Sequence, residues 1–136
     1  MRISIIIAFL LLPITAAQGE YAAREMTRVA ASGVPLRLGF ANALNPDCSA
    51  QGPTPMRLVQ SPQHGTVRIA QVRDFPAYGA NDVRRVCNQR RVTGMLAQYI
   101  SRRGFVGADS LVIDIIIPGG HGRATVRLVQ RRPQGS

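Results

Sequence analysis

Apolar and polar side chains alternate along several short segments of the chain, most regularly in residues 109–117. Leu111, Ile113, Ile115 and Ile117 fall on one side of an extended chain, because successive side chains of a strand point to opposite faces. Valine and isoleucine are restricted about χ1 and fit a pleated surface. The segment therefore predicts a well-buried strand with which other strands pair.

Shorter segments with the same period of two predict the neighbouring strands. They are residues 34–40, 56–60, 66–72, 92–100 and 124–128. A tight turn at residues 61–65 predicts that the strands on either side of it form a β-hairpin. Gly94 is expected to mark a bulge within its strand. Residues 41–55 and 73–91 are rich in turn formers and are expected to be irregular.

The start of the domain is ambiguous. Residues 21–31 contain good helix formers, but residues 26–31 also fit a first strand, which we slightly favour. No segment of the chain has a convincing helical period. About seven short strands separated by turns predict an all-β sandwich.

The first residues predict an export signal. Arg2 precedes a short apolar core at residues 5–12, and small residues follow it. This run is far shorter than the roughly 20 apolar residues of a membrane-spanning helix. We expect cleavage after Ala17 or Gly19 and a periplasmic or secreted protein. The expected divisions of the chain are a signal peptide over residues 1–19, a β-sandwich domain over residues 20–130 and a disordered tail over residues 131–136.

Cys48 and Cys87 are the two cysteines of the chain. An even number of cysteines in an exported protein favours a disulfide. The alternative is a pair of free or metal-binding thiols, and neither cysteine belongs to a Cys-x-x-Cys pair. A disulfide between them would close a loop of about 40 residues. It would contribute on the order of 4 kcal/mol to the stability of the fold by restricting the unfolded chain.

Two motifs resemble bacterial cadherin-like and immunoglobulin-like repeat domains. The first is Pro-Gln-His-Gly-Thr-Val at residues 62–67, and the second runs from Tyr99 through Gly-Phe-Val-Gly-Ala-Asp-Ser at residues 104–110. The resemblance implies an immunoglobulin-like Greek-key sandwich that serves without catalysis as an adhesive or spacer module at the cell envelope. Those domains usually carry aromatic residues in the strand after the aspartate, where this chain has Leu-Val-Ile.

The same motifs supply a set of expected structural turn residues, which are His64, Gly65, Tyr99, Gly104, Phe105, Gly107 and Asp109. Gly104 and Gly107 are expected to adopt positive φ, and Phe105 to plug the end of the core. Asp109 is expected to accept hydrogen bonds from turn N–H groups. Tyr99 is expected to supply the corner hydrogen bond of such sandwiches.

Catalytic and metal-binding patterns are missing from the sequence. His64 and His121 lie in glycine-rich turns without companion ligands. Asp109 and Asp114 are separated by an odd number of positions, which places them on opposite faces of a strand. Ser110 is not part of a Gly-x-Ser-x-Gly motif. We therefore expect no enzyme activity, no cofactor and no metal.

The positive charge of the chain is carried by arginine alone, and the formal net charge is +10. The guanidinium group suits carboxylates and phosphates. A predicted anion-binding site comprises Arg84, Arg85, Arg90 and Arg91 around Cys87, together with Arg102 and Arg103. A solvated face produced by biased codon usage is the simpler interpretation of these arginines.

Two functions follow from the sequence. The first is a non-catalytic exported module that binds an envelope protein or supports envelope structure. The second is arginine-mediated binding of an anionic polymer or of lipid head groups at a membrane surface. Nucleic acid is an unfavourable partner, since export separates the protein from it and the chain has few aromatic side chains for base stacking.

Overall fold

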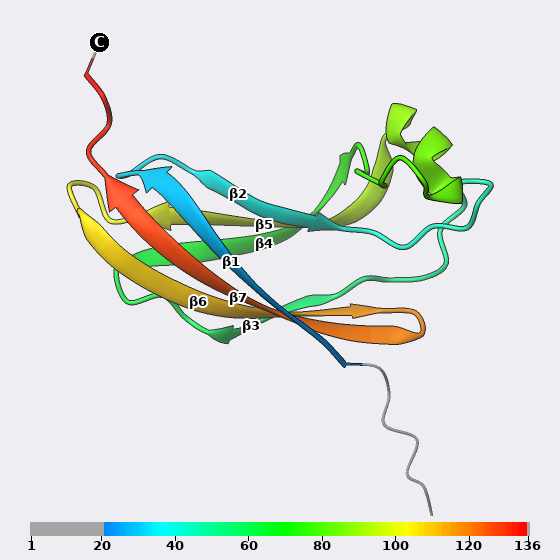
Figure 1. The fold of residues 1–136 in the computed structure, drawn as a ribbon, viewed down its shortest axis with the longest axis horizontal. Helices are drawn as coiled ribbons and strands as arrows, with labels where there is room; N and C mark the ends of the chain where they lie inside the picture. The colour runs from blue at the N-terminus through cyan, green and yellow to red at the C-terminus, as the bar shows by residue number, and fades with distance from the viewer. Residues whose placement is uncertain (1–20, 136) are drawn as a thin grey trace, which may run out of the picture.

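The computed structural model describes residues 21–135, and these residues form a sandwich of two β-sheets (Figure 1). The four-stranded sheet contains, in spatial order, β1 (Tyr21–Ala31), β7 (Gly120–Arg131), β6 (Gly107–Ile117) and β3 (Met56–Gln60). The three-stranded sheet contains β2 (Leu36–Ala41), β5 (Val92–Ser101) and β4 (Gly65–Asp74). The predicted all-β sandwich with seven strands is confirmed. The expected signal peptide over residues 1–19 lies outside the described residues, and so does Ser136 of the expected tail.

The first segment forms a strand rather than a helix. β1 runs parallel to β7 along its whole length, from the pair Tyr21 and His121 to the pair Ala31 and Arg131. The strand is therefore longer than the predicted residues 26–31. Pairing with β7 outweighs the helix propensity of its alanines and arginines, because intrinsic propensities are small beside tertiary interactions.

The predicted hairpin between residues 56–60 and 66–72 is wrong. β3 pairs with β6 in one sheet, and β4 pairs with β5 in the other, so the turn between them carries the chain across the sandwich. Both segments have one apolar face, and each packs that face onto the core from its own sheet. Alternation specifies which face is buried but leaves the pairing partner open.

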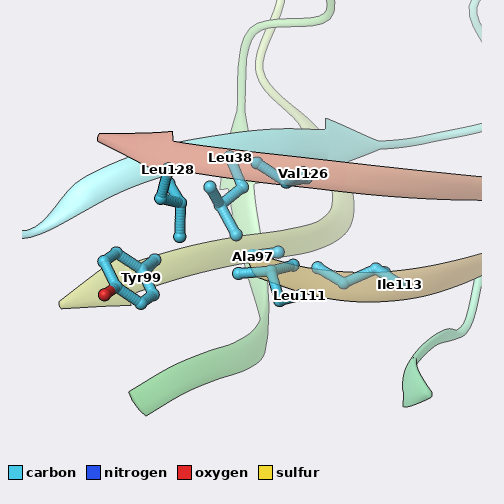
Figure 2. Packing of buried hydrophobic residues seen from close by; sticks show 7 residues of the cluster. All are labelled: Leu38, Ala97, Tyr99, Leu111, Ile113, Val126 and Leu128. Carbon is cyan, nitrogen blue, oxygen red and sulfur yellow. The ribbon is translucent and has the colours of Figure 1, made fainter. Parts of the chain in front are cut away.

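The core lies between the two sheets (Figure 2). Its buried members are Leu38, Ala97 and Tyr99 from the three-stranded sheet and Leu111, Ile113, Val126 and Leu128 from the four-stranded sheet. The inward face predicted for residues 109–117 is thus correct in its first part. At the other end of β6, Ile117 is 42% exposed, because the strand extends into the β6–β7 hairpin.

Gly94 does not mark a bulge. The β4–β5 register runs without a shift through the pair Val72 and Gly94. A Cβ atom at Gly94 would lie 2.4 Å from the Ala41 carbonyl oxygen and 2.5 Å from the Phe40 ring. The glycine is therefore needed for close packing against β2, where neighbouring backbone leaves no room for a side chain.

One short helix interrupts the predicted irregular segment at residues 73–91. The 3₁₀ helix η1 (Val83–Gln89) is capped at its N-terminus by Asp82, whose carboxylate accepts a hydrogen bond from the Arg84 N–H at 2.8 Å. Seven residues are too few to give a readable helical period in the sequence. Within residues 21–135 there is no helix long and apolar enough to cross a membrane.

Candidate functional site

Asp109 joins the two sequence motifs, since it bonds to His64, which lies 45 positions earlier in the chain. Its Oδ1 accepts hydrogen bonds from the backbone N–H groups of Gln63 and Ser110, each at 2.9 Å. Its Oδ2 accepts the backbone N–H of His64 and the hydroxyl of Tyr99, again at 2.9 Å each. Asp109 is 9% exposed and Tyr99 is fully buried. Each carboxylate oxygen thus has two partners, and the side chain holds the β3–β4 connection against β6.

The environment of this pair shifts both acid–base equilibria. Burial raises the pKa of the Asp109 carboxyl, but the hydrogen bonds from Gln63, His64, Tyr99 and Ser110 outweigh burial, so that its pKa lies below the ordinary value. Burial, followed by the bond to the Asp109 carboxylate, raises the pKa of the Tyr99 hydroxyl. Asp109 is therefore ionised and Tyr99 is neutral at ordinary pH, as a structural pair requires.

The turn residues around this pair have specific geometry. Gly104 and Gly107 adopt φ values of +86° and +138°, which favour glycine. A Cβ atom at Gly65 would lie 2.4 Å from the Ile100 carbonyl oxygen and 2.7 Å from the Tyr99 ring. The glycine therefore allows β4 to pass directly over the tyrosine.

Phe105 lies outside the core cluster, so the expectation that it plugs the core is wrong. Its ring stacks on the His64 ring, with the centroids 4.0 Å apart and the planes at 9°. One Arg102 nitrogen lies 3.3 Å from His64 Nδ1 and donates to the Gln63 carbonyl at 3.3 Å. Positive φ at the flanking glycines turns the loop back toward the β3–β4 connection. The contacts of His64 are therefore explained by its role in the turn.

The second histidine and the second strand aspartate form a separate group. Asp114 pairs with Arg123, whose Nε and terminal nitrogen lie 2.6 and 2.9 Å from the two carboxylate oxygens, and His121 Nε2 lies 3.4 Å away. His121 belongs to β7 rather than to a turn, because β7 begins at Gly120. The bond from Arg123 holds the pKa of Asp114 below its ordinary value despite burial. Asp109 and Asp114 have different partners, and within residues 21–135 there is no group of three or more potential metal ligands.

The disulfide between Cys48 and Cys87 is confirmed. The two Cα atoms lie 5.5 Å apart, and the bond joins residues separated by 39 positions. Cys87 is fully buried and is the one buried residue of η1. The bond thus fixes η1 to the loop that connects β2 and β3.

The six arginines of the predicted anion-binding site form two groups. Arg84, Arg85, Arg90 and Arg91 lie in or beside η1, whereas Arg102 and Arg103 lie in the β5–β6 connection at the opposite end of the sandwich (Figure 1). β5 separates the groups, since it runs from one end of the molecule to the other. A single site that contains all six is therefore ruled out by the fold.

Within the first group the arginines differ in their contacts. Arg84 donates two hydrogen bonds to the Asp82 carboxylate at 2.8 and 2.7 Å and lies over the Tyr78 ring at 4.5 Å. These bonds lower the pKa of Asp82 to about 2. Arg91 lies over the Phe75 ring at 5.4 Å. The Arg84 side chain is thus held by Asp82 and Tyr78, while Arg85 and Arg90 are exposed to solvent.

Sequence reasoning missed the apolar part of this surface. Val83 is 73% exposed and Val86 is 64% exposed. Side chains three residues apart lie on the same side of a 3₁₀ helix, so the two valines face the same direction. We define the η1 surface as Val83, Arg85, Val86 and Arg90. The sequence contains the Val-x-x-Val spacing of these residues. The spacing indicates a shared face only when the segment is known to form a 3₁₀ helix.

Comparison with protein-family models gives no match, and neither does comparison with curated proteins. Among solved structures, a chain in the structure of PbICP-C in complex with falcipain-2 is similar at a TM-score of 0.38 and 10% sequence identity. The likeness covers 87% of this chain and 96% of that chain. At this distance it has no implication for what this chain binds, and the family of the chain stays open.

Proposed function

We propose that this chain is a non-catalytic, exported binding module of the cell envelope, and that the η1 surface is its contact site. The observation that supports this proposal most directly is the pair of valines, Val83 and Val86, held in water by a disulfide-anchored helix. Large exposed apolar side chains that are grouped together are typical of interaction sites. Arginine is enriched at protein interfaces, and Arg85 and Arg90 are exposed positions in or next to the same helix.

The proposed fold assignment within this function is an immunoglobulin-like Greek key. The chain crosses between the sheets from β1 to β2, from β2 to β3, from β3 to β4 and from β5 to β6. Repeated crossings of this kind are typical of Greek-key sandwiches. The motifs at residues 62–67 and 104–110 support the assignment, since Asp109 connects them.

Export is supported by two features that agree. The apolar N-terminal segment has the composition of a signal peptide. Disulfides persist in oxidising compartments, where an exported chain would fold. Mass spectrometry of the protein collected outside the cytoplasm tests this part, and an unprocessed N-terminus in that fraction would count against it.

The contact site is tested by capture of a partner from envelope extracts. The double variant Val83→Ser with Val86→Ser should reduce recovery of any bound envelope protein at least tenfold, because truncating central apolar contacts costs more than 1 kcal/mol each. A matched control is Val59→Ser with Val106→Ser, which alters valines that are 46% and 51% exposed elsewhere. Equal recovery with both double variants would contradict the proposed site.

A second candidate function is the binding of anionic envelope polymers or lipid head groups by the same surface. It is favoured by Arg85 and Arg90, for which the described part of the chain provides no ion pair, whereas Arg84 is paired with Asp82. Arginines near an anionic lipid surface contribute about 1 kcal/mol each. Exposed valines beside them can enter the interface of the bilayer.

Ionic strength separates the two candidates. Cosedimentation with phosphatidylglycerol vesicles should weaken steeply with added salt if arginines provide the attraction, while an apolar protein interface should respond little. Arg85→Gln with Arg90→Gln should weaken vesicle binding by about 30-fold. Arg57→Gln with Arg68→Gln is the control, since it makes the same charge change on exposed strand positions. A similar loss in the control would show that net charge alone is responsible.

A further inference from the structure

A second concave site lies at the end of the sandwich where β1 begins. A pocket of about 450 Å³ is formed there by the first residues of β1 and by the β6–β7 hairpin. The pairing of Tyr21 with His121 places these two segments side by side (Figure 1). The lining is mostly apolar, and Gly120 and Gly122 provide a wall without side chains. The volume is within the range of about 300–1,000 Å³ that is typical of small-molecule sites.

The apolar lining continues the interior of the protein. Ile115 and Ile117 line the pocket and share a face of β6 with Ile113, which is a core residue. Met26 also lines the pocket and packs against the core. A second pocket of about 230 Å³ shares Met26, Ile115 and Ala124 with the first and extends to core residues such as Ile113. The two pockets thus form an apolar path from the surface toward the space between the sheets.

Arg24 is the charged side chain of β1 that lines the pocket. Its side chain lies on the same face of the strand as those of Ala22 and Met26. It lines both pockets and therefore lies where they meet. The described residues provide no hydrogen bond or ion pair for it. Glu25 points to the other face of the strand and lies 3.6 Å from Arg127, while Asp114 of the hairpin is held by Arg123. An arginine beside an apolar pocket, without a carboxylate of its own, is suited to the anionic group of a ligand.

We propose that this pocket binds an amphiphile with an unbranched acyl chain and an anionic head group. The chain lies against Ile115, Ile117 and Ala124, and the head group accepts hydrogen bonds from the Arg24 guanidinium. The site is independent of the η1 surface, which lies in a different part of the fold. A free fatty acid and a phospholipid both carry this chemistry, and binding of dodecanoate compared with removal of lipid from vesicles separates the two sources.

The binding test uses a fluorescent fatty-acid analogue, 11-dansylaminoundecanoic acid, with the protein purified after export. The probe should bind in the pocket and be displaced by dodecanoate. Each further buried CH₂ group of the competitor should strengthen displacement by about fourfold until the pocket is full. Dodecanol, which lacks the anionic group, should compete about tenfold more weakly than dodecanoate. Equal competition by the alcohol and the acid would overturn the role assigned to Arg24.

Four variants locate the site. Ala22→Trp should fill the pocket and abolish probe binding, whereas Ala23→Trp, on the opposite face of the same strand, should leave it unchanged. Arg24→Gln should weaken dodecanoate binding by about tenfold, whereas Arg103→Gln makes the same charge change at an exposed site outside the lining. Unchanged binding by Ala22→Trp, or an equal effect of Ala22→Trp and Ala23→Trp, would overturn the proposal.

Methyl NMR of the wild-type protein provides a readout that needs no variant. Dodecanoate should shift the Ile115 and Ile117 methyl signals and leave that of Ile69, on the other sheet, in place.

A parallel experiment replaces dodecanoate with phosphatidylglycerol vesicles and measures the lipid removed from them. Effects at these methyls with dodecanoate alone assign a free fatty acid, and lipid removal that depends on Ala22 assigns a phospholipid. Absence of both effects would overturn the proposal.

Discussion

The hydrogen bond between Tyr99 and Asp109 should be one of the strongest single polar contributions to the stability of this fold. Tyr99→Phe removes the hydroxyl and leaves the ring in place, so that no large cavity is created. The lost bond has an ionised acceptor and is buried, since Tyr99 is fully buried and Asp109 is 9% exposed. Hydrogen bonds to charged groups contribute about 1.5–3 kcal/mol. We expect the free energy of unfolding to fall by this amount.

Urea unfolding followed by far-ultraviolet circular dichroism measures this change directly. For a domain of this size the loss corresponds to a decrease in Tm of about 4 °C per kcal/mol. The matched control is Tyr78→Phe, which removes a hydroxyl that donates to Asn42 Oδ1 at the same distance of 2.9 Å. That bond is between neutral groups and only partly buried, so its loss should cost about 1 kcal/mol or less. If Tyr99→Phe costs no more than Tyr78→Phe, the role assigned to the buried carboxylate is incorrect.

The pH dependence of stability provides an independent check on the same carboxylate. The pKa of Asp109 in the folded protein lies below its ordinary value of 3.8, which is close to the value in the unfolded chain. A lowered pKa stabilises the fold fully above the unfolded pKa, and this stabilisation is lost as the pH falls through the folded pKa. The difference in stability between wild type and Asp109→Asn should therefore be constant above about pH 5 and shrink toward about pH 2. A difference that does not change over this range would contradict the assignment.

Three further perturbations test other parts of the fold. Reduction of the bond between Cys48 and Cys87 should lower the free energy of unfolding by about 4 kcal/mol in the chain-entropy model. Urea unfolding with and without reductant measures this loss, and an unchanged midpoint would argue against the bond. Gly65→Ala should cost about 1–3 kcal/mol because its Cβ would meet backbone and the tyrosine ring, whereas Gly79→Ala, with open space around it, should be nearly neutral. Gln130→Met should raise the free energy of unfolding by about 1 kcal/mol, because Gln130 is 1% exposed and its amide atoms lack partners among the described residues. A lower Tm of the variant in calorimetry would contradict this expectation.

The candidate surfaces depended on the tertiary structure more than the strands did. The sequence suggested one arginine site, but the fold places η1, which contains Arg84, and the β5–β6 connection, which contains Arg102, at opposite ends of the sandwich. It also pairs Arg84 with Asp82. Arginine content can be read from a sequence, whereas partners and location depend on how β5 crosses the molecule. The pocket at Arg24 was not visible in advance, because it requires β1 to pair in parallel with β7, some 100 positions away.

By itself, the sequence determined the strand class of the fold, the buried face of the first part of the 109–117 segment, the glycine-bracketed turn and the pairing of the two cysteines. Each of these follows from local alternation of apolar and polar residues, from turn chemistry or from the presence of two cysteines in the chain. The tertiary structure alone decided which sheet each strand joins, as the separation of β3 from β4 shows, and which donors surround Asp109. The physical reason is that a strand with one apolar face can pack onto the core from either sheet, and only the assembled set of long-range contacts selects one arrangement.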